Sequence, residues 1–349
     1  MKALCFYEHG ELDVLQYTDV PDPEPGSGQV LVRVRACALN HLDVWVRRGW
    51  PGLKLELPHW TGADMAGEII GLGTGVTGWE IGQRVVVDPG ISTREDEFTR
   101  RGEHSVSPGY IVLGEHVRGG QAEYVAVPAT SLMPIPASAD ATHPIDFPQA
   151  AAPLLASLTA WRMLIHRAKL RPGESVLIVG AGGGVNSMAI QIAKLAGATV
   201  YALTSTEEKM EKAHALGADV VLNYREDRNW SKTLYKMTDR RGVDVVVDNV
   251  GQATLPQSMR AVVRGGRIVI VGNTSGPQAR IDVRFIFGKQ ISIIGSTMGS
   301  HQDFRDVMKL VWAGKLKTVV DRVMPLSEGK AAYEALEQGE QFGKIVLLP

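Results

Sequence analysis

The stretch that decides the fold is VLIVGAGGGVNSMAIQIAKL, residues 176–195. The apolar run Val176–Val179 is typical of a buried strand, and the periodic apolar residues of Met188–Leu195 are typical of a helix. The glycines between them would let the backbone approach a pyrophosphate, whose charge is met by free N–H groups at the helix start. This pattern predicts a dinucleotide-binding turn, with a tight structural turn as the alternative.

The alternation of a short β-branched run with a longer amphipathic stretch continues along the chain. The runs begin 21 to 24 residues apart, at Val176, Thr199, Val220, Asp244, Arg267 and Ile291. Because parallel strands need crossovers of about ten residues or more, this spacing predicts an α/β fold with a doubly wound sheet of six parallel strands. The intervening helices are expected to begin at Asn186, Glu207, Trp230 and Thr254.

The first 134 residues differ, with short β-rich segments separated by turn signals. Val30–Leu39 is a strand candidate because Arg33 and Arg35 alternate with its apolar residues. After Gly295 the regular pattern stops, and Lys344–Leu348 is expected to return to the first domain. We therefore assign residues 1–150 and 297–349 to a mostly β domain and residues 151–296 to the dinucleotide domain.

Composition excludes several classes of protein. The 349 residues include 37 Lys plus Arg and 38 Asp plus Glu, a formal net charge of −1, so neither a nucleic-acid partner nor a membrane-surface partner is expected. We find no signal-peptide pattern and no apolar run long enough to cross a bilayer, so a cytoplasmic location is expected. The two cysteines, Cys5 and Cys37, are too few for a disulfide framework or for a site of four thiolates.

The end of the second strand bears on the choice of cofactor. An acidic residue there would bind the ribose 2′-OH of NAD and repel a 2′-phosphate. This strand ends in Leu203–Thr206 without a carboxylate before Glu207, and Lys209 follows within one helical turn. We therefore predict NADPH rather than NADH; the alternative is that Ser205 caps the helix and Lys209 is a solvated surface charge.

The chain resembles the medium-chain dehydrogenase/reductase superfamily over essentially its whole length. The resemblance rests on ACALNHLD at residues 36–43, GADMAGEIIGLGTGV at residues 62–76, the glycine-rich turn and a closing GKIV at residues 343–346. It implies a Rossmann dinucleotide-binding domain and a GroES-like catalytic domain, a small-molecule substrate, and a homodimer or homotetramer. Such oligomers often form by continuing the cofactor sheets edge to edge, and here the strand from Ile291 would make that contact.

The zinc alcohol dehydrogenases of this superfamily hold a catalytic zinc and a structural zinc. Alignment places the catalytic ligand positions at Asn40, Ala63, Asp64 and Leu155, and the structural ones at Thr93, Asp96, Thr99 and Ser107. None carries a thiolate or an imidazole, so we predict that the chain binds no zinc. The lobe of the structural zinc is then expected to be held by surface ion pairs, among Arg94, Glu95, Asp96, Glu97, Arg100, Arg101 and Glu103.

The residues that remain resemble the zinc-independent quinone and enoyl reductases of the superfamily, which carry an Asn-x-x-Asp motif and a Lys and a Tyr on the 2′-phosphate. Here His41 replaces the usual Pro of that motif, and the long lobe is a feature of the zinc enzymes. The predicted function is NADPH-dependent hydride transfer to a quinone or an α,β-unsaturated carbonyl, such as an enone or an enoyl thioester. The alternatives are an alcohol dehydrogenase with a non-standard metal site and a non-catalytic nucleotide-binding protein.

Four polar residues near the motif are the candidate catalytic residues. Asn40 is expected to donate its amide to cofactor or substrate, or else to be a strand-end turn residue. Asp43 could orient Asn40 or His41, or cap the following helix, and His41 is a candidate proton donor or a packing residue. Asp64 is expected to be a buried, hydrogen-bonded carboxylate.

The candidate cofactor residues lie at the carboxyl ends of the predicted strands, where open α/β sheets bind ligands, or match positions that bind the cofactor in the superfamily. They are Thr159, Gly180, Gly182, Gly183, Gly184, Val185, Thr204, Ser205, Lys209, Tyr224, Asn249, Val250, Val271, Gly272 and Lys344. For those at strand ends, ordinary turns are the alternative.

Overall fold

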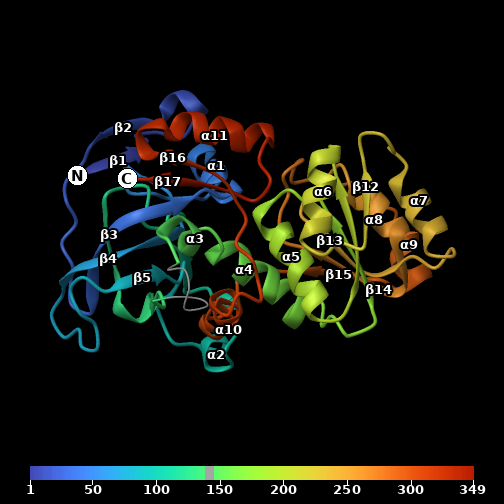
Figure 1. Ribbon diagram of the computed structural model, residues 1–349, viewed down its shortest axis with the longest axis horizontal. Helices are drawn as coiled ribbons and strands as arrows, with labels where there is room; N and C mark the ends of the chain where they lie inside the picture. Colours follow the sequence, from blue (N-terminus) through green and yellow to red (C-terminus); the bar gives the residue numbers. More distant parts are fainter. Residues whose placement is uncertain (138–144) are drawn as a thin grey trace. The chain divides into compact units, whose positions relative to one another are not determined.

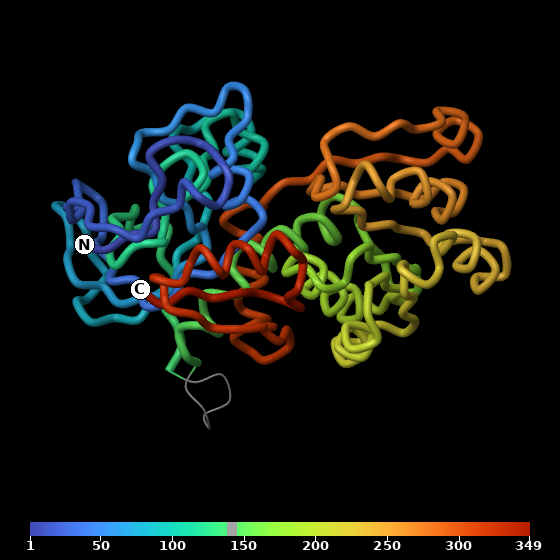
Figure 2. The backbone as a smooth tube through the Cα atoms, turned by 90° about the horizontal axis from the view of Figure 1, so that it is seen from above, coloured from blue at the N-terminus to red at the C-terminus, as the bar shows by residue number. Residues whose placement is uncertain are grey.

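The computed structural model describes residues 1–137 and 145–349. The chain divides into two compact units, Met1–Leu155 with Gly299–Pro349, and Ala156–Met298. Figure 2 shows the last segment of the chain, in red, lying with the blue N-terminal segments in the first unit. No helix in the described residues is long and apolar enough to cross a membrane.

The second unit is the predicted sheet of six parallel strands, in the order β12-β11-β10-β13-β14-β15 (Figure 1). Its strands are β10 (Ser175–Val179), β11 (Thr199–Thr204), β12 (Val220–Asn223), β13 (Val243–Asp248), β14 (Val262–Ile270) and β15 (Ser292–Gly295). Strands β11 and β12 lie on one side of β10, and β13, β14 and β15 lie on the other. The helix that follows β10 therefore begins at the middle of the sheet. The predicted Rossmann topology is confirmed.

Helices connect these strands. They are α4 (Leu154–Trp161), which continues as a π-helix over Arg162–Arg167, α5 (Gly184–Leu195), α6 (Glu207–Ala215), α7 (Trp230–Met237), α8 (Leu255–Ala261) and α9 (Val283–Lys289). In Figure 1, α5 and α6 lie on one side of the sheet and α7, α8 and α9 on the other. Apolar side chains from the strands and from α7, among them Leu177, Leu203, Trp230 and Leu234, form a core on one face of the sheet.

Two strand or helix starts of this unit differ from the sequence prediction by two residues or more. Helix α5 begins at Gly184 rather than Asn186, because the extended Gly183 is already its N-cap. Strand β14 begins at Val262 rather than Arg267, because Val262 pairs with Val243 before a bulge interrupts the ladder. Gly265, at φ 74°, lies in that bulge.

The first unit is built on a largely antiparallel sheet in the order β16-β17-β3-β4-β5-β9, with β8 also paired to β3. The strands of the unit are β1 (Lys2–Cys5), β2 (Gln16–Asp19), β3 (Gln29–Ala38), β4 (Asp64–Leu72), β5 (Arg84–Val87), β6 (Gly90–Ser92), β7 (Tyr110–Val112), β8 (Tyr124–Pro128), β9 (Leu132–Pro134), β16 (Val320–Pro325) and β17 (Lys344–Leu348). Its α-helices are α1 (His41–Arg48), α2 (Glu97–Arg100), α3 (Phe147–Ala151), α10 (His301–Trp312) and α11 (Gly329–Gln338).

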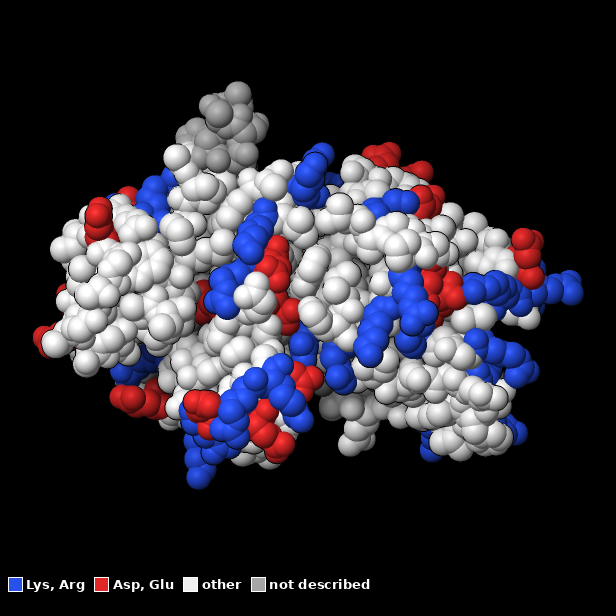
Figure 3. Space-filling model, turned by 90° about the horizontal axis from the view of Figure 1, so that it is seen from below, with Lys and Arg blue, Asp and Glu red and all other residues white. Residues whose placement is uncertain are grey.

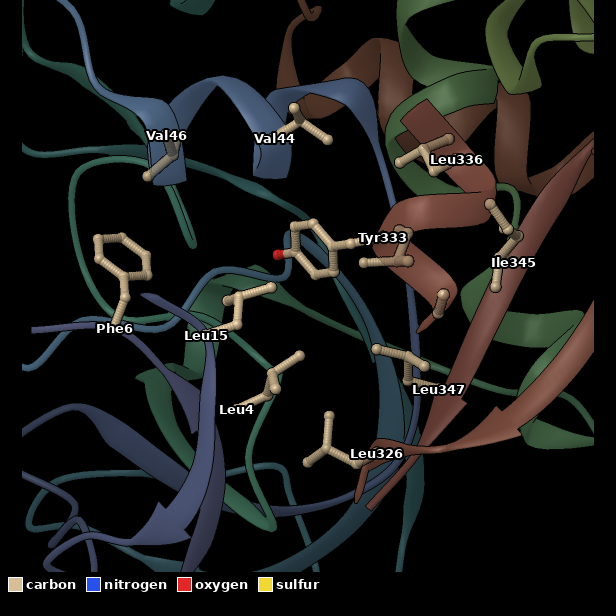
Figure 4. Close-up of a cluster of buried hydrophobic side chains, with 13 residues drawn as sticks. Leu4, Phe6, Leu15, Val44, Val46, Leu326, Tyr333, Leu336, Ile345 and Leu347 are labelled. Atoms are coloured by element: carbon tan, nitrogen blue, oxygen red, sulfur yellow. The ribbon is translucent and has the colours of Figure 1, made fainter. Parts of the chain in front are cut away.

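One core of this unit joins segments from both ends of the chain (Figure 4). Phe6 from the N-terminal segment, Val44 from α1, Tyr333 from α11 and Leu347 from β17 pack together, each at most 2% exposed. The C-terminal segment therefore completes the N-terminal core, as the sequence predicts.

On the face shown in Figure 3, basic and acidic side chains are interspersed.

Candidate active site

Three neighbouring strands of the first unit bring three polar residues to one place. Ala38 of β3 pairs with Asp64 of β4 on one side and with Val346 of β17 on the other. Side chains alternate between the faces of a strand, so residues two positions apart lie on the same face. Asn40 is two positions from Ala38 and Lys344 is two positions from Val346, so both fall on the same side of the sheet as Asp64. Strand register thus joins residues separated by up to 304 positions in sequence.

The Lys344 ammonium lies between the other two side chains. Its Nζ donates to Asp64 Oδ2 at 2.8 Å and to Asn40 Oδ1 at 2.5 Å, and Asn40 Nδ2 donates to the same Asp64 Oδ2 at 2.9 Å. The other carboxylate oxygen, Asp64 Oδ1, accepts the backbone N–H of Leu155 at 2.6 Å. Asp64 is fully buried and Lys344 is 5% exposed, whereas Asn40 is half-buried. We call these residues the Asn40–Asp64–Lys344 cluster.

Asp43 holds the backbone beneath this cluster. Its carboxylate accepts the N–H of Asn40 at 2.7 Å and the N–H of Gly62 at 3.0 Å, tying the start of α1 to the segment that leads into β4. Burial raises the pKa of Asp43 to about 6, against those two hydrogen bonds and the charge of Lys344, which lower it. Both predicted roles of Asp43 are compatible with this geometry, because it orients Asn40 from the first turn of the helix.

His41 is the first residue of α1 and is half-buried. Burial and the positive charge of Lys344 lower the pKa of its imidazole. His41 is therefore neutral at pH 7, a state in which one ring nitrogen can still donate a proton in a hydrogen bond.

The glycine-rich turn of the second unit has the geometry of a phosphate cradle. Gly180 ends β10 with φ 86°, a conformation that favours glycine, and Gly183 precedes α5 in an extended conformation. No side chain of the described residues caps α5, so its first N–H groups are open to an anion. These residues fit the pyrophosphate of a dinucleotide.

Asn186 stands where the last small residue of the glycine motif is expected, and it holds the turn together. Its Nδ2 donates to the carbonyls of Val179 and Gly180 at 2.7 and 2.8 Å, and its Oδ1 accepts Asn249 Nδ2 at 2.7 Å. Asn249 Oδ1 in turn accepts the N–H of Val271 at 3.3 Å. This chain of amides links the carboxyl ends of β10, β13 and β14.

The residues predicted at the adenosine end come together at the ends of β11 and β12. Thr204 pairs with Asn223, and the N–H of Tyr224 donates to the Thr204 carbonyl at 3.0 Å. Thr206, not Ser205, is the N-cap of α6, and its hydroxyl accepts the N–H of Lys209. The alternative role of Ser205 as the helix cap is therefore wrong.

Thr159 in α4 is 3% exposed, and its hydroxyl has no hydrogen-bond partner among the described residues. A buried hydroxyl without a partner is costly, which is consistent with a bound ligand supplying one. The glycine turn and this hydroxyl are both compatible with a bound dinucleotide.

Comparison with known proteins agrees with this geometry. The family described as "Alcohol dehydrogenase GroES-like domain" matches residues 26–137, and the one described as "Zinc-binding dehydrogenase" matches residues 184–313. The chain is 31% identical to the acryloyl-coenzyme A reductase of Metallosphaera sedula, with 99% of each chain covered, and 30% identical to the human quinone oxidoreductase, with 100% and 98% covered. A solved structure described as an NAD-dependent alcohol dehydrogenase shares 42% identity and a TM-score of 0.94, with both chains fully covered.

The chain belongs to the medium-chain dehydrogenase/reductase superfamily. It is accordingly an oxidoreductase of that superfamily, and the first unit is its GroES-like domain. Relatives in the superfamily carry names of alcohol dehydrogenases, quinone oxidoreductases and enoyl-thioester reductases, so the names alone do not select a substrate.

The zinc implied by one family name does not fit the catalytic position of this member of the superfamily. Of the four aligned positions, Asn40, Ala63, Asp64 and Leu155, only Asp64 offers a usual zinc ligand. Both oxygens of that carboxylate are already engaged, and the ammonium 2.8 Å away would repel a divalent cation. Within residues 1–137 and 145–349, no group of three or more His, Cys, Asp or Glu is arranged to hold a metal ion.

The lobe that holds structural zinc elsewhere in the superfamily is organised here by hydrogen bonds. Asp96 Oδ1 accepts the N–H groups of Phe98 and Thr99 at 2.9 and 3.0 Å, and its Oδ2 accepts the Ser107 hydroxyl at 2.5 Å. Thr99 Oγ1 accepts the N–H of Asp96 at 2.8 Å, and Thr93 Oγ1 donates to the Gly109 carbonyl at 2.8 Å. The four aligned positions therefore hold the lobe through hydroxyls and one carboxylate.

The expected ion-pair network is a minor part of this lobe. Its pairs are long and exposed: Arg94 to Asp96 at 3.8 Å, Arg100 to Glu95 at 3.5 Å and Arg101 to Glu103 at 3.6 Å. Exposed pairs of this kind contribute well under ~1 kcal/mol each. The prediction that surface charges hold the lobe is corrected, because the buried Ser107 hydroxyl and the Asp96 cap make the shorter bonds.

Lys344 is the residue whose surroundings sequence reasoning missed. It was predicted among the cofactor residues, but the structure brings its ammonium to Asn40 and Asp64 inside the first unit. Its place opposite Asn40 follows from the β17–β3 register, which a single sequence does not reveal. Trp60 is 5% exposed and donates to the Gly119 carbonyl at 3.0 Å, so it is a core residue.

A second polar group was also missed. His301 begins α10, and its ring nitrogens lie 2.7 Å from Asp88 Oδ2 and 3.1 Å from Ser92 Oγ. These bonds attach α10 to the strands at the base of the lobe. His301 is 213 positions from Asp88 and 209 from Ser92, so no local motif could have marked the group.

Proposed function

We propose that this protein is a zinc-independent, NADPH-dependent reductase that transfers hydride to a quinone or to the C=C bond of an α,β-unsaturated carbonyl. The observation that carries the proposal is the ammonium of Lys344 on Asp64, where zinc members of the superfamily place their metal ligands. Oxidation of an alcohol in this fold relies on a Lewis acid to stabilise an alkoxide. Reduction of a conjugated C=C bond needs only hydrogen-bond donors at the carbonyl oxygen.

The residues of the chain supply orientation and donors. NADPH, when bound, supplies the hydride. As the β carbon accepts it, negative charge gathers on the substrate oxygen, and a donor placed there accelerates the reaction by roughly 10²–10³. Asn40 is proposed as that donor, since it is half-buried and one Nδ2 hydrogen is not used by Asp64. His41 is proposed to relay a proton to the α carbon: one ring nitrogen gives its proton while the other takes one from solvent, so the imidazole is neutral before and after the step.

Binding of the cofactor is proposed to use the residues at the carboxyl ends of the strands, together with Thr159. Gly180, Gly182–Gly184 and Val185 would hold the pyrophosphate. Asn249, Val250, Val271 and Gly272 would line the nicotinamide side. Thr204, Ser205, Lys209 and Tyr224 would hold the 2′-phosphate, because β11 ends without a carboxylate that would repel it.

The choice of NADPH is tested by Lys209→Ala. We expect the Kd for NADPH to rise about tenfold while the Kd for NADH stays within about twofold, the loss of one charge-assisted contact. Titration of nucleotide fluorescence measures both constants. A variant that binds NADPH as well as the wild type would remove Lys209 from the site.

The reaction is tested by following NADPH consumption with a panel of enones, quinones and enoyl-CoA esters. Turnover is expected, and Asn40→Ala should lower kcat more than it raises the Kd for NADPH. An unchanged kcat would take Asn40 out of the mechanism. No turnover on the whole panel despite tight NADPH binding would favour a non-catalytic nucleotide-binding protein.

A second candidate function is alcohol oxidation with a non-standard metal site. It is favoured by the 42% identity to the solved structure described as an alcohol dehydrogenase. Metal analysis of the purified protein by mass spectrometry, combined with an alcohol-oxidation assay, separates the two. About one zinc per chain together with alcohol turnover would reject the reductase proposal.

A further inference from the structure

We propose that Lys344 is a positioning residue for Asn40 in the active site, a buried cation that fixes the orientation of the Asn40 amide. The inference rests on the proposed reductase function, and it says how the Asn40 amide is oriented so that its N–H can donate to the substrate. It is carried by three observations: the bonds of the Lys344 ammonium, the orientation they impose on the Asn40 amide, and the charge balance of the buried cluster.

The bonds of Lys344 leave the Asn40 amide one orientation. An ammonium can only donate, so the group that faces Lys344 Nζ at 2.5 Å must be the carbonyl oxygen Oδ1. A carboxylate can only accept, so the group that faces Asp64 Oδ2 at 2.9 Å must be Nδ2. Asn40 is therefore clamped at both ends of its amide, and rotation by 180° would break both contacts.

These two contacts determine which hydrogen-bonding group of Asn40 is left for a ligand. One Nδ2 hydrogen is donated to Asp64, and the second has no acceptor within residues 1–137 and 145–349. The Lys344 ammonium that contacts Oδ1 is positively charged and draws electron density through the planar amide of Asn40. This polarisation makes the second N–H a stronger donor. We infer that the second N–H meets the carbonyl oxygen of the substrate, which acquires negative charge when the β carbon is reduced.

The charge balance of the cluster supports a fixed cation. Lys344 and Asp64 form a buried pair whose partners are 5% and 0% exposed. The ammonium also influences titratable groups around it: its charge lowers the pKa of His41 and opposes the burial that raises the pKa of Asp43 and of Cys37. Lys344 thus contributes positive charge at the start of α1, where Asn40 is the N-cap.

The decisive variant is the double replacement Asp64→Asn with Lys344→Met, which removes both charges together. The single change Lys344→Met would leave the buried Asp64 carboxylate without a positive charge beside it, although Asn40 and Leu155 would still donate to it, so folding could confound the result. Lys344→Arg keeps the charge with altered geometry and serves as the conservative rescue. Lys289→Met is the matched control, because Lys289 is also a partly buried ammonium but donates to the carbonyls of Met259, Arg260 and Val262 in the other unit.

In the double variant we expect kcat with the best acceptor to fall on the order of 10²-fold, while the KM for NADPH stays within about threefold. Lys344→Arg should recover at least a tenth of the wild-type kcat, and Lys289→Met should keep all of it. A folded double variant with kcat within about threefold of the wild type would overturn the inference and leave the reductase proposal standing.

A second readout does not depend on turnover. The side-chain amide signals of Asn40 in ¹⁵N NMR spectra, assigned by their loss in Asn40→Ala, should show slowed hydrogen exchange in the wild type. The signals should exchange faster in the double variant, because the clamp is gone. In a variant that neutralises Lys344, the NMR-measured pKa of His41 should rise. If the wild type reduces no acceptor, the reductase proposal fails, whereas unchanged Asn40 signals in the double variant refute the inference by themselves.

Discussion

Asp43 is a carboxylate whose environment disfavours its charge. Its pKa is raised from 3.8 to about 6 because it is buried, despite the N–H groups of Asn40 and Gly62 that it accepts. Between these two values the folded protein keeps a proton that the unfolded chain has lost. The unfolding free energy therefore falls as the pH rises through this window.

This linkage predicts a pH-dependent difference between the wild type and Asp43→Asn. As the pH rises from 3 to 7, the wild type should lose up to about 3 kcal/mol of stability relative to the variant, which cannot titrate there. Urea unfolding of both proteins at several pH values measures the difference. A gap that stays constant or widens with pH would show that Asp43 is not destabilised as a carboxylate.

At the scale of elements, the lobe of residues 88–116 depends on one side chain that joins two segments within it. Ser107, 6% exposed, donates to Asp96 and accepts the N–H of Gly109 at 3.0 Å. The Ser107 hydroxyl holds the pKa of Asp96 below its usual value. The lobe is therefore expected to depend on Ser107 rather than on a chelatable metal.

We predict that Ser107→Ala lowers stability by about 1 kcal/mol and raises amide hydrogen exchange within the lobe. Arg100→Ala, which removes only an exposed pair with Glu95, should leave exchange unchanged. Exchange detected by mass spectrometry locates the effect. A metal chelator that loosens the wild-type lobe as much as Ser107→Ala would reject this explanation.

The glycine-rich turn is a second element held by one side chain. Asn186 makes three hydrogen bonds there, to Val179, Gly180 and Asn249. Asn186→Ala should weaken NADPH binding about tenfold and cost about 2 kcal/mol of stability, because buried carbonyls lose their donors. Gln257→Ala, which also removes hydrogen bonds in this unit but away from the turn, is the control. Equal effects of both variants on the Kd for NADPH would argue against a local role for Asn186.

At the scale of the whole molecule, the edge of the six-stranded sheet is open. Strand β15 ends the sheet, and Ile293 on it is 37% exposed. Val283 and Phe287, one helical turn apart on the adjoining α9, are 60% and 71% exposed. An exposed strand edge beside large apolar side chains favours pairing with another copy of the chain.

We therefore predict a homodimer or homotetramer that Phe287→Asp combined with Ile293→Lys converts to a smaller species. Light scattering after size-exclusion chromatography measures the mass. Ile81→Asp, an equally exposed apolar position at 69% in the other unit, should leave the mass unchanged. A wild type that runs as a monomer, or a double variant of unaltered mass, would contradict this assembly.

Local chemistry determined much of this protein before any tertiary contact was considered. The six runs and the glycines at 180–184 predicted the parallel sheet and its cofactor turn, because strand and helix periodicities are properties of neighbouring residues. The residues at the former zinc positions could be read from the sequence as well, since ligand type depends on residue identity. Only the tertiary structure decided what occupies that place instead. The Lys344 ammonium reaches Asp64 and Asn40 across the register of β17, β3 and β4, and Ser107 reaches Asp96 across the lobe. Such contacts arise from strand pairing and chain closure, which no local pattern records.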